Sequence, residues 1–597
     1  MGRYPGRADE GRCYPRSVRL LEIRLLEGPN LYRLEPVVKV EVALGRRRTW
    51  YGRRDPEPHM LVRLAEAVPA RLLPSRVAAL VEWVRRLRRE FPDGTGGTVL
   101  VHRSSDPGHW ILTWPWAEED RAKAIAESAL ALVEREVPST GTVRPGRGRQ
   151  RLLARVSARI EEAHGAGPAY IRDKDRRLPI VSISGTNGKT TTTRLIAHIL
   201  REAGRRVGLT TSDGIVVGTE MVEEGDWTGF GGARQILTRD DIDIAVLETA
   251  RGGILLRGIA YESNEASVVT NVSPDHLDLQ GIHTLPELAE VKITIARITK
   301  PSGWVVLNAD DRFVSAFARK VRGKVAFFSL EGDASPRIRR HLRDGGRAYL
   351  VRDGVLGEAE GDRWRPLASL ADVPVVLGGI ARHNVANALA ASGAARAMGA
   401  TLAQVGAGLR SFLPTQADSR GRLNVFQDER RVVVVDFAHN EAGVGVLVDV
   451  AEAIAESIGR GEGDGKGGRA RVTFIVGLAG DRPDDTLRGV GRLVASRTDR
   501  FVQKEMLHYL RGRTRESVLG EIRGGAAEGG WTGEIPLYVD EPTAVSGELD
   551  RTEGAEKPEV IVLLCHEDRE GVYEVLAKRG LEPVNDPGEL ARLVAPR

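Results

Sequence analysis

The stretch that most constrains the fold is residues 178–200, which read LPIVSISGTNGKTTTTRLIAHIL. Its first part is an apolar run typical of a buried strand, and its last part repeats apolar residues at helical spacing. Between them lies the glycine loop 184–190. Strand, glycine loop and helix together favour phosphate binding, because the glycines let backbone N–H groups point inward and the helix N-terminus adds partial positive charge.

Two side chains of this loop extend the phosphate interpretation. Lys189 supplies a full charge for the outer phosphates, and the Thr190 hydroxyl is placed to ligate Mg²⁺. The strict P-loop pattern would need glycine at position 183, where Ile183 stands, so the loop is the shorter GTNGKT. The alternative is a glycine turn with a surface lysine. We favour the phosphate loop because a strand and a helix flank it correctly.

Composition limits the function classes. The chain has 597 residues, which predicts three to four domains, and its 87 basic and 82 acidic residues leave a net charge of only +5. That balance does not indicate nucleic acid. The only cysteines are Cys13 and Cys565, so a disulfide framework is excluded and we expect a reducing cytoplasm. No apolar run approaches the roughly 18 residues of a membrane span, and the N-terminus lacks the apolar core of a secretory signal.

The pattern along the chain predicts an α/β protein in four parts. Residues 1–138 form a small α+β domain, and 139–170 form a Gly/Pro/Arg-rich linker with one helix. Residues 171–420 alternate strand and helix, which predicts a central domain built on a parallel sheet that carries the phosphate loop. Residues 421–597 alternate again and indicate a Rossmann-like C-terminal domain. No G-x-G-x-x-G opens this last part, so a dinucleotide is not indicated.

The N-terminal part carries a basic run, Arg85–Arg89, and three tryptophans lie nearby in sequence: Trp110, Trp114 and Trp116. One interpretation is a cradle for an acidic or polymeric substrate. The other is a solvated helix face beside core tryptophans, and we favour it.

Polar residues follow the strands of the central part. Glu248 ends one predicted strand, and Asp275 and His276 follow the next. Each alone could be a solvated cap or a turn. In open α/β sheets, however, ligands gather at the carboxyl ends of the strands, where the phosphate loop also lies. The sequence therefore predicts a catalytic site at this edge.

Further polar residues are candidates on weaker grounds. Lys292 falls on a predicted helix, where a lysine is usually at the surface. Asn384 and Asn387 lie at a helix start, where they can cap the helix or hydrogen-bond a base edge. In the C-terminal part, polar residues again follow strands, at Asp436, His439, Asn440, Asp481 and Arg482.

Five motifs occur together in one order: GTNGKTT, the strand-end Glu248, N-x-x-x-D-H, HNxxN and D-x-A-H-N, over about 178–480. In this the chain resembles the Mur ligase family, ATP-dependent ligases that join an amino acid to a carboxylate. Within the family, TTSDGI, LETARGGIL and GRLN resemble the C-terminal ligase half of cyanophycin synthetases. The stretch LLEGPNLYRLEPVVKVEVALG resembles their N-terminal domain.

Two departures from cyanophycin synthetases bear on the activity. Those enzymes carry an ATP-grasp domain where this chain has only the short linker and one helix, so we expect the second ligase activity to be absent. The segment DHLDLQG, 275–281, is closer to the cell-wall peptide ligases.

The resemblance implies roles for individual residues. Those implied to hold the ATP phosphates are Gly185, Thr186, Asn187, Gly188, Lys189, Thr190 and Thr191. Thr190 with Glu248 would hold one Mg²⁺ and His276 a second, while Lys292 falls where several members carbamylate a lysine. Residues implied to meet the nucleotide are Asn384 and Asn387, Arg422 at phosphate and Asp436 at ribose, with His439 and Asn440 beside them. Asp481 and Arg482 are candidates for substrate contact.

The resemblance thus implies an ADP-forming amide ligase that uses ATP and Mg²⁺. It would activate a carboxylate as an acyl phosphate and join it to the amine of an amino acid. The expected partner is an acidic peptide or polymer, with the N-terminal domain helping to hold it. We expect no nucleic acid or membrane partner, and a homo-oligomer is possible. Alternatives are a cell-wall precursor ligase of the UDP-N-acetylmuramyl peptide type, a non-catalytic ATP-binding subunit, or a nucleic-acid-binding ATPase that rests only on the pI and Arg85–Arg89.

Overall fold

The structure is a computed structural model, and its chain forms two compact units that are described separately. The described residues are 18–44, 65–135, 147–274, 277, 279–459, 468–555 and 557–594. The first unit comprises Met1–Ile171, Gly252–Glu262 and Gln280–Val291. The second comprises Arg172–Arg251, Ser263–Leu279 and Lys292–Arg597. Within the described ranges, no helix combines the length and the apolar character that crossing a membrane requires.

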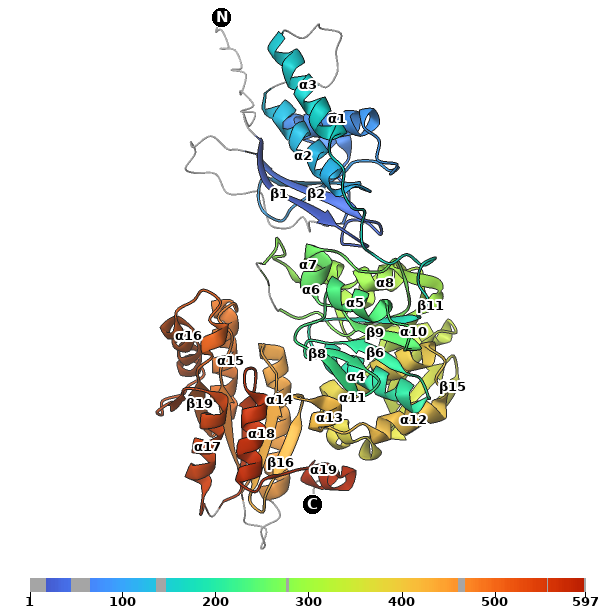
Figure 1. Cartoon of the computed structure of the whole chain (residues 1–597). Coiled ribbons are helices and arrows are strands. Elements are labelled where there is room, and N and C mark those ends of the chain that lie inside the picture. Colours follow the sequence, from blue (N-terminus) through green and yellow to red (C-terminus); the bar gives the residue numbers. More distant parts are fainter. Residues whose placement is uncertain are drawn as a thin grey trace, which may run out of the picture. The chain divides into compact units, whose positions relative to one another are not determined.

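The first unit is built on a four-stranded antiparallel sheet in the order β1-β2-β4-β3. Its strands are β1 Val18–Leu26, β2 Val37–Leu44, β3 Leu100–Arg103 and β4 His109–Pro115. Its longer helices are α1 Ser75–Glu90, α2 Glu119–Glu134 and α3 Arg147–Glu161, which lie on one side of the strands (Figure 1). Because strand side chains alternate between faces, Val38, Val40 and Val42 point into the core with these helices. The predicted α+β character is therefore observed.

The basic run and the tryptophans of this unit have structural roles. Trp114 and Trp116 are buried in the core of the unit. On α1, Arg85 and Arg86 form ion pairs with Glu82 and Glu90, one helical turn away. The favoured interpretation, a solvated helix face beside core tryptophans, is confirmed.

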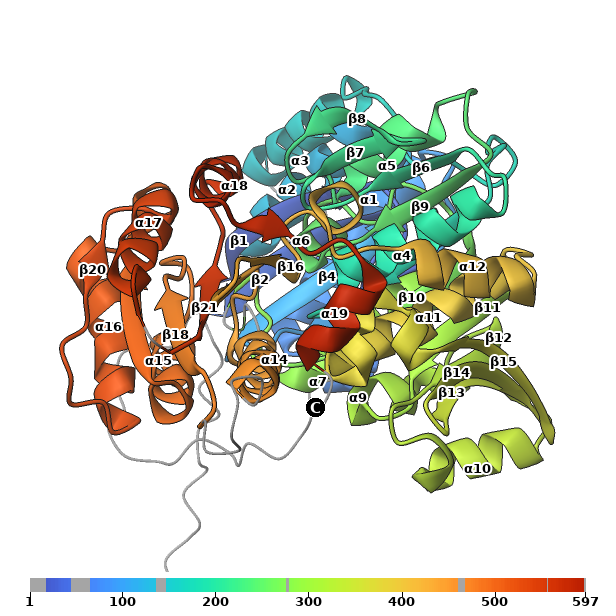
Figure 2. The ribbon, with the colours of Figure 1, turned by 90° about the horizontal axis from the view of Figure 1, so that it is seen from below.

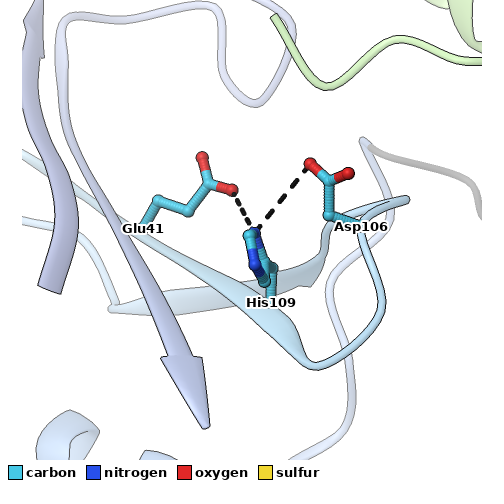
Figure 3. Close-up of side chains that lie close together, drawn as sticks. All are labelled: Glu41, Asp106 and His109. Carbon is cyan, nitrogen blue, oxygen red and sulfur yellow. Dashed lines mark hydrogen bonds and ion pairs between the residues drawn. The ribbon is translucent and has the colours of Figure 1, made fainter. Parts of the chain in front are cut away.

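The other face of this sheet is charged. Glu41 and His109 come from the paired strands β2 and β4, and Asp106 lies in the loop before β4. His109 Nδ1 lies 3.2 Å from Glu41 and 3.9 Å from Asp106 (Figure 3). The ammonium of Lys39 lies 2.9 Å from the other oxygen of Glu41. These side chains line a cavity of about 360 Å³.

The second unit contains a central sheet of 11 strands. Its strands are β5 Ile180–Ser184, β6 Val207–Thr210, β7 Gly214–Val217, β8 Glu220–Glu224, β9 Ile244–Glu248, β10 Asn264–Val269, β11 Thr299–Asn308, β12 Lys324–Phe328, β13 Arg347–Arg352, β14 Val355–Glu360 and β15 Arg363–Ser369. Spatial order is β15-β14-β13-β12-β11-β10-β5-β9-β6-β7-β8, and β13 through β6 are parallel. The phosphate-loop strand β5 is thus central, between β10 and β9.

Helices accompany this sheet along the chain. They are α4 Lys189–Glu202, α5 Phe230–Leu237, α8 Thr294–Arg297, α9 Arg312–Ser315, α10 Pro336–Arg343, α11 Arg382–Ala397, α12 Leu402–Ser411 and α13 Gln416–Ser419. Helices α6 Arg251–Leu256 and α7 Leu285–Lys292 fall almost wholly in the first unit. Apolar residues of α4, α11 and α12 form one core with the strands. The sequence pattern missed the antiparallel hairpins at both ends, β7-β8 and β14-β15. The turn at Asp353-Gly354, with φ of 48° and 72°, is an Asp-Gly hairpin signal between β13 and β14.

The C-terminal part of this unit is a second, seven-stranded sheet in the order β20-β19-β18-β21-β17-β16-β22. Its strands are β16 Asn424–Gln427, β17 Arg431–Asp436, β18 Arg471–Val476, β19 Arg500–Lys504, β20 Leu537–Tyr538, β21 Glu559–Leu564 and β22 Glu582–Pro583. Its helices are α14 Glu441–Gly459, α15 Asp484–Arg497, α16 Arg515–Glu528, α17 Glu541–Thr552, α18 Arg569–Lys578 and α19 Pro587–Val594. Strands β20 to β17 are parallel, and α14 and α15 pack on one face while α17 and α18 pack on the other (Figure 2). The predicted α/β class with a Rossmann-like C-terminal domain is confirmed.

A buried ion pair ties this C-terminal sheet to the loop after β21. Lys504 and Glu541 have no exposed surface and contact each other. Glu541 also accepts hydrogen bonds from the backbone N–H groups of His566, Glu567 and Asp568. Burial alone would raise the pKa of Glu541, but the ammonium of Lys504 and these donors lower it to about 2.

We predict that Lys504→Met destabilises the C-terminal domain by about 3–5 kcal/mol at neutral pH, because it leaves a buried carboxylate without its cation. The matched control is Lys578→Met, which removes an exposed i,i+4 pair with Glu574 and should cost less than about 1 kcal/mol. Urea unfolding measures both free energies of unfolding, and equal losses in the two variants would contradict the assignment.

The same pair predicts a pH dependence. Since the folded pKa of Glu541 lies below its ordinary value of 4.5, its contribution is complete above pH 4.5 and is lost as the pH falls towards 2. The stability difference between wild type and Lys504→Met should therefore shrink over that range.

Candidate active site

Two glycines give the loop between β5 and α4 its shape. Gly185 and Gly188 have φ of 149° and 83°, a region that other residues rarely adopt. Space is also restricted, because a Cβ on Gly185 would lie 1.9 Å from Thr270 Oγ1 and one on Gly188 would lie 2.2 Å from Asn387 Oδ1. The loop therefore needs glycine at both positions.

The strand-end residues of β10 fix the loop from the other side. Asn271 Oδ1 accepts a hydrogen bond of 3.0 Å from the Asn187 N–H. The Asn187 carbonyl accepts from Thr270 Oγ1 at 2.7 Å and from Asn271 Nδ2 at 3.0 Å. Ser273 exchanges hydrogen bonds of 3.1 and 3.2 Å with the Thr186 hydroxyl. These contacts hold the loop against the end of β10.

A hydroxyl–carboxylate pair lies at the start of α4. Thr190 Oγ1 donates to Glu248 Oε2 at 2.9 Å, and Glu248 is 3% exposed at the end of β9. Burial raises the pKa of Glu248, although the nearby Lys189 ammonium opposes this. A buried carboxylate whose charged form is disfavoured, beside a hydroxyl oxygen, is a donor set that suits a hard divalent cation.

Two lysines contact the backbone of the loop. Lys189 Nζ donates to the Thr186 carbonyl at 2.9 Å, and Lys292 Nζ donates to the Gly185 carbonyl at 2.6 Å. Lys292 ends α7 and is 5% exposed, so the usual surface position of a helix lysine does not apply to it. The contact with the loop explains its burial, because the carbonyl compensates for part of the lost hydration.

The two asparagines of α11 lie inside the helix rather than at its cap. Ala381 occupies the N-cap position. Asn384 Nδ2 donates to the Val375 carbonyl at 2.9 Å, and Asn387 Nδ2 donates to Asn384 Oδ1 at 3.0 Å. The capping alternative is therefore wrong. Asn387 Oδ1 also accepts from Thr192 Oγ1 at 3.3 Å, which places its amide beside the phosphate loop.

The C-terminal domain also reaches the loop within this unit. Asn440 and Asn187 exchange two side-chain hydrogen bonds, of 2.9 and 3.2 Å. Near them, His439 Nδ1 lies 3.1 Å from the Phe437 carbonyl. Asp436 accepts from the backbone N–H groups of Leu423 and Ala438, both at 2.7 Å. Burial raises the pKa of Asp436, and the nearby Arg422 guanidinium opposes this.

Arg422 connects this region to the hydroxyl–carboxylate pair. Its guanidinium stacks on Phe437, 4.2 Å from the ring centroid. Its Nη2 lies 3.5 Å from Ser212 Oγ, which in turn lies 3.3 Å from Thr190 Oγ1. Thr191, which follows Thr190 in the first turn of α4, is buried.

Other predicted residues lie elsewhere or outside the description. Asp481 and Arg482 follow β18, where they pair with each other at 3.8 Å and Arg513 donates to the Arg482 carbonyl. These contacts lie within the C-terminal domain. Asp275 and His276 lie outside the described residues, so their predicted role stays a prediction.

Sequence reasoning missed a charged group next to the site. Asp213 binds Arg194 at 2.9 Å and Arg569 at 2.8 Å. Burial would raise the pKa of Asp213, but Arg422, Arg194 and Arg569 together lower it. The signal was available, because Asp213 follows β6 at the same sheet edge that drew attention to Glu248.

The arrangement fits a phosphate and a metal. Backbone N–H groups at the start of α4 and the Lys189 ammonium suit an anion, while Thr190 and Glu248 offer oxygen ligands to a cation. The carboxyl edge of the parallel sheet thus presents groups that suit a cation next to groups that suit an anion.

Comparison with known proteins gives a family match and several relatives. Residues 183–395 match the Mur ligase middle domain. Cyanophycin synthetase from Trichormus variabilis is 38% identical over 381 residues, which are 64% of this chain and 41% of that protein. The 2,6-diaminopimelate ligase of Alkalilimnicola ehrlichii, which acts on UDP-N-acetylmuramoyl-L-alanyl-D-glutamate, is 27% identical over 426 residues, covering 68% and 76% of the two chains. The chain therefore spans about two fifths of the length of the cyanophycin synthetases that it matches.

Among solved structures, E. coli FolC in complex with ADP matches with a TM-score of 0.47 and 19% identity, over 67% of this chain and 90% of that one. The family match confirms the predicted likeness to Mur ligases where the sequence placed it, around the phosphate loop, Glu248 and the asparagines of α11. The matched stretch, residues 183–395, is similar to the Mur ligase middle domain and contains the phosphate loop and Glu248.

Proposed function

We propose that this protein is an ATP-dependent, ADP-forming amide ligase that activates a carboxylate as an acyl phosphate and joins it to an amino acid amine. One observation carries the proposal: Thr190 donates to the buried Glu248 carboxylate at the start of a helix that follows a glycine loop with Lys189. Such a site suits a nucleotide triphosphate with its metal.

In this proposal the chain's own residues bind the nucleotide and its metal and orient the phosphoryl group that is transferred. ATP supplies the phosphoryl group when bound, and Mg²⁺ neutralises its charge. Backbone N–H groups of residues 185–191 hold the phosphates, and the Lys189 ammonium stabilises charge that develops on the transferred group. Thr190 and Glu248 hold the metal. Two further roles rest on the family resemblance alone: binding of a second Mg²⁺ by His276 and carbamylation of Lys292.

The nucleotide would extend from this loop toward α11 and the C-terminal domain. Asn384 and Asn387 are assigned to the base side, Arg422 to phosphate and Asp436 to ribose. The Asn187–Asn440 amide pair supports this, because it brings the C-terminal domain to the phosphate loop. His439 and Asn440 would face the substrate, as Asp481 and Arg482 would after a movement of their loop.

We propose an acidic peptide or polymer as the acceptor, since cyanophycin synthetases are the relatives with the highest identity given above. Without an ATP-grasp domain between residues 138 and 171, the chain would add one residue type. The N-terminal α+β domain, with its charged cavity, would help to hold the acceptor. The domain boundaries near 138, 170 and 420, a cytoplasmic location and a homo-oligomeric state remain part of the proposal.

A second candidate is a cell-wall precursor ligase. The observation in its favour is the match to the 2,6-diaminopimelate ligase, which extends over 76% of that enzyme. A UDP-N-acetylmuramyl peptide as acceptor distinguishes this candidate from the first.

Lys189→Ala should lower ATP-dependent phosphate release by roughly 100-fold or more, because it removes a full charge at the transferred group. The control is Lys174→Ala, an exposed lysine before β5, which should keep wild-type turnover. Release is measured with a coupled phosphate assay. Wild-type turnover in Lys189→Ala would refute the assignment of the loop.

Glu248→Gln should raise the Mg²⁺ concentration that half-saturates the protein by about tenfold, because it replaces an anionic ligand by a neutral one. The readout is the thermal midpoint at a fixed concentration of AMPPNP during a Mg²⁺ titration, which needs no acceptor. Glu202→Gln, at the exposed end of α4, is the control. An unchanged Mg²⁺ dependence in Glu248→Gln would exclude Glu248 as a ligand.

Substrate identity is tested by incubating the protein with ATP, single amino acids and either acidic peptides or UDP-N-acetylmuramyl peptides. We expect a mass increase of one residue on an acidic peptide together with release of ADP. Synthesis of cyanophycin from aspartate and arginine by this chain alone would contradict a single ligase activity. A product only on the nucleotide-linked peptide would favour the second candidate.

A further inference from the structure

Three arginines converge near one buried carboxylate beside the proposed catalytic site. Asp213, whose side chain is 3% exposed, binds Arg194 Nη2 at 2.9 Å and Arg569 Nη2 at 2.8 Å. The Arg422 guanidinium also lowers the pKa of Asp213. Arg194 and Arg569 thus share one carboxylate, which leaves excess positive charge between them, whereas Arg422 is also balanced by Asp436 and Glu248.

The excess charge is energetically unfavourable without a further anion. The Arg194 side chain is 11% exposed, and burial lowers its pKa. The charge of Asp213 opposes this effect, while the charges of Arg422 and Arg569 lower the pKa further. Arg569 Nη1 is buried and makes no hydrogen bond to any residue that the structure describes. A buried donor without an acceptor indicates that the site lacks one of its partners.

Local structure holds the arginines in place. Gly421 has φ of 67°, and a Cβ there would lie 2.7 Å from Arg569 Cδ, so glycine makes room for this side chain. The N–H of Gly421 donates to Asn424 Oδ1 at 2.8 Å and to the hydroxyl of Tyr573 at 3.1 Å. The approach of Arg569 is therefore built into the backbone.

The cluster borders the pair that would hold the metal. Asp213 follows Ser212, whose hydroxyl lies 3.3 Å from Thr190 Oγ1. Arg194 and Thr190 are four residues apart on α4, so they share one side of that helix. An anion at the arginines would thus lie next to the transferred phosphoryl group.

We propose that Arg194 and Arg569, gathered on Asp213, form the binding site for the carboxylate of the acidic acceptor and hold it beside Thr190. This deepens the proposed function and rests on it for the role of the carboxylate. Asp213 orients the two guanidinium groups and partly balances their charge while no acceptor is bound. Arg422 remains with the nucleotide.

The experiment measures binding of a hexa-aspartate peptide to the full chain by calorimetry, with and without AMPPNP and Mg²⁺, and uses hexa-asparagine as the neutral peptide. Arg194→Gln and Arg569→Gln should each raise the Kd for hexa-aspartate about tenfold or more, because each removes a charged hydrogen-bond donor. Arg569→Lys should recover part of that loss.

Arg420→Gln is the matched control. It removes the same charge from the segment between α13 and β16, but Arg420 pairs with Glu224 and Glu570 rather than with Asp213. It should leave the hexa-aspartate Kd unchanged. The affinity for AMPPNP is measured for every variant and should match that of the wild type. The thermal midpoint is measured for every variant as well, and the Kd values are compared at a temperature at which all variants are folded.

Each failure has a distinct signature. Equal binding of hexa-aspartate and hexa-asparagine, or equal affinity in the glutamine variants and the wild type, would overturn the carboxylate site. Loss of AMPPNP affinity with unchanged peptide affinity would overturn it too, because the arginines would then serve the nucleotide phosphates. Absence of AMPPNP binding to the wild type would instead contradict the proposed function, while the titration without nucleotide still decides the inference.

Discussion

The hydrogen bond from Thr190 to the buried carboxylate of Glu248 is the contact on which the rest of the site depends. It joins the first turn of α4 to the end of β9, so it fixes the phosphate loop against a neighbouring strand of the central sheet. Because burial disfavours the charged form of Glu248, the pair is most stable with a cation nearby. The glycines at 185 and 188 then bring the backbone within reach of an anion.

Much of the fold follows from local pattern, because strand and helix alternate with clear periods around the phosphate loop. The alternation of strands and helices did not reveal the antiparallel strands at the two sheet edges, although Asp353-Gly354 offered a turn signal at one of them. Lys292 shows a further limit. A lysine on a helix usually lies at the surface, whereas a loop carbonyl more than 100 residues away in sequence accepts the hydrogen bond of this one. Contacts of this kind depend on tertiary packing, and the sequence carries only the residue type.

Charge is distributed so that buried groups compensate one another. Lys504 and Glu541 neutralise each other inside the C-terminal sheet, where a structural role is sufficient. Around Asp213, two arginines share one carboxylate beside the proposed phosphate site. The position of Glu248 after a parallel strand identified it from the sequence, and Asp213 has the same kind of position. No sequence rule, however, indicates that Arg569 would approach Asp213 from the C-terminal domain. The contrast separates a fold-stabilising pair from a site prepared for an anionic ligand.

The central claim is that a nucleotide triphosphate binds at the loop between β5 and α4, with its metal on Thr190 and Glu248. A crystal structure of the protein with AMPPNP and Mg²⁺ tests this most directly. The account predicts the phosphates at the backbone N–H groups of the loop and at Lys189, and the metal in contact with both oxygen ligands. Nucleotide bound at another place, or phosphates at the loop with the metal away from Glu248, would contradict it.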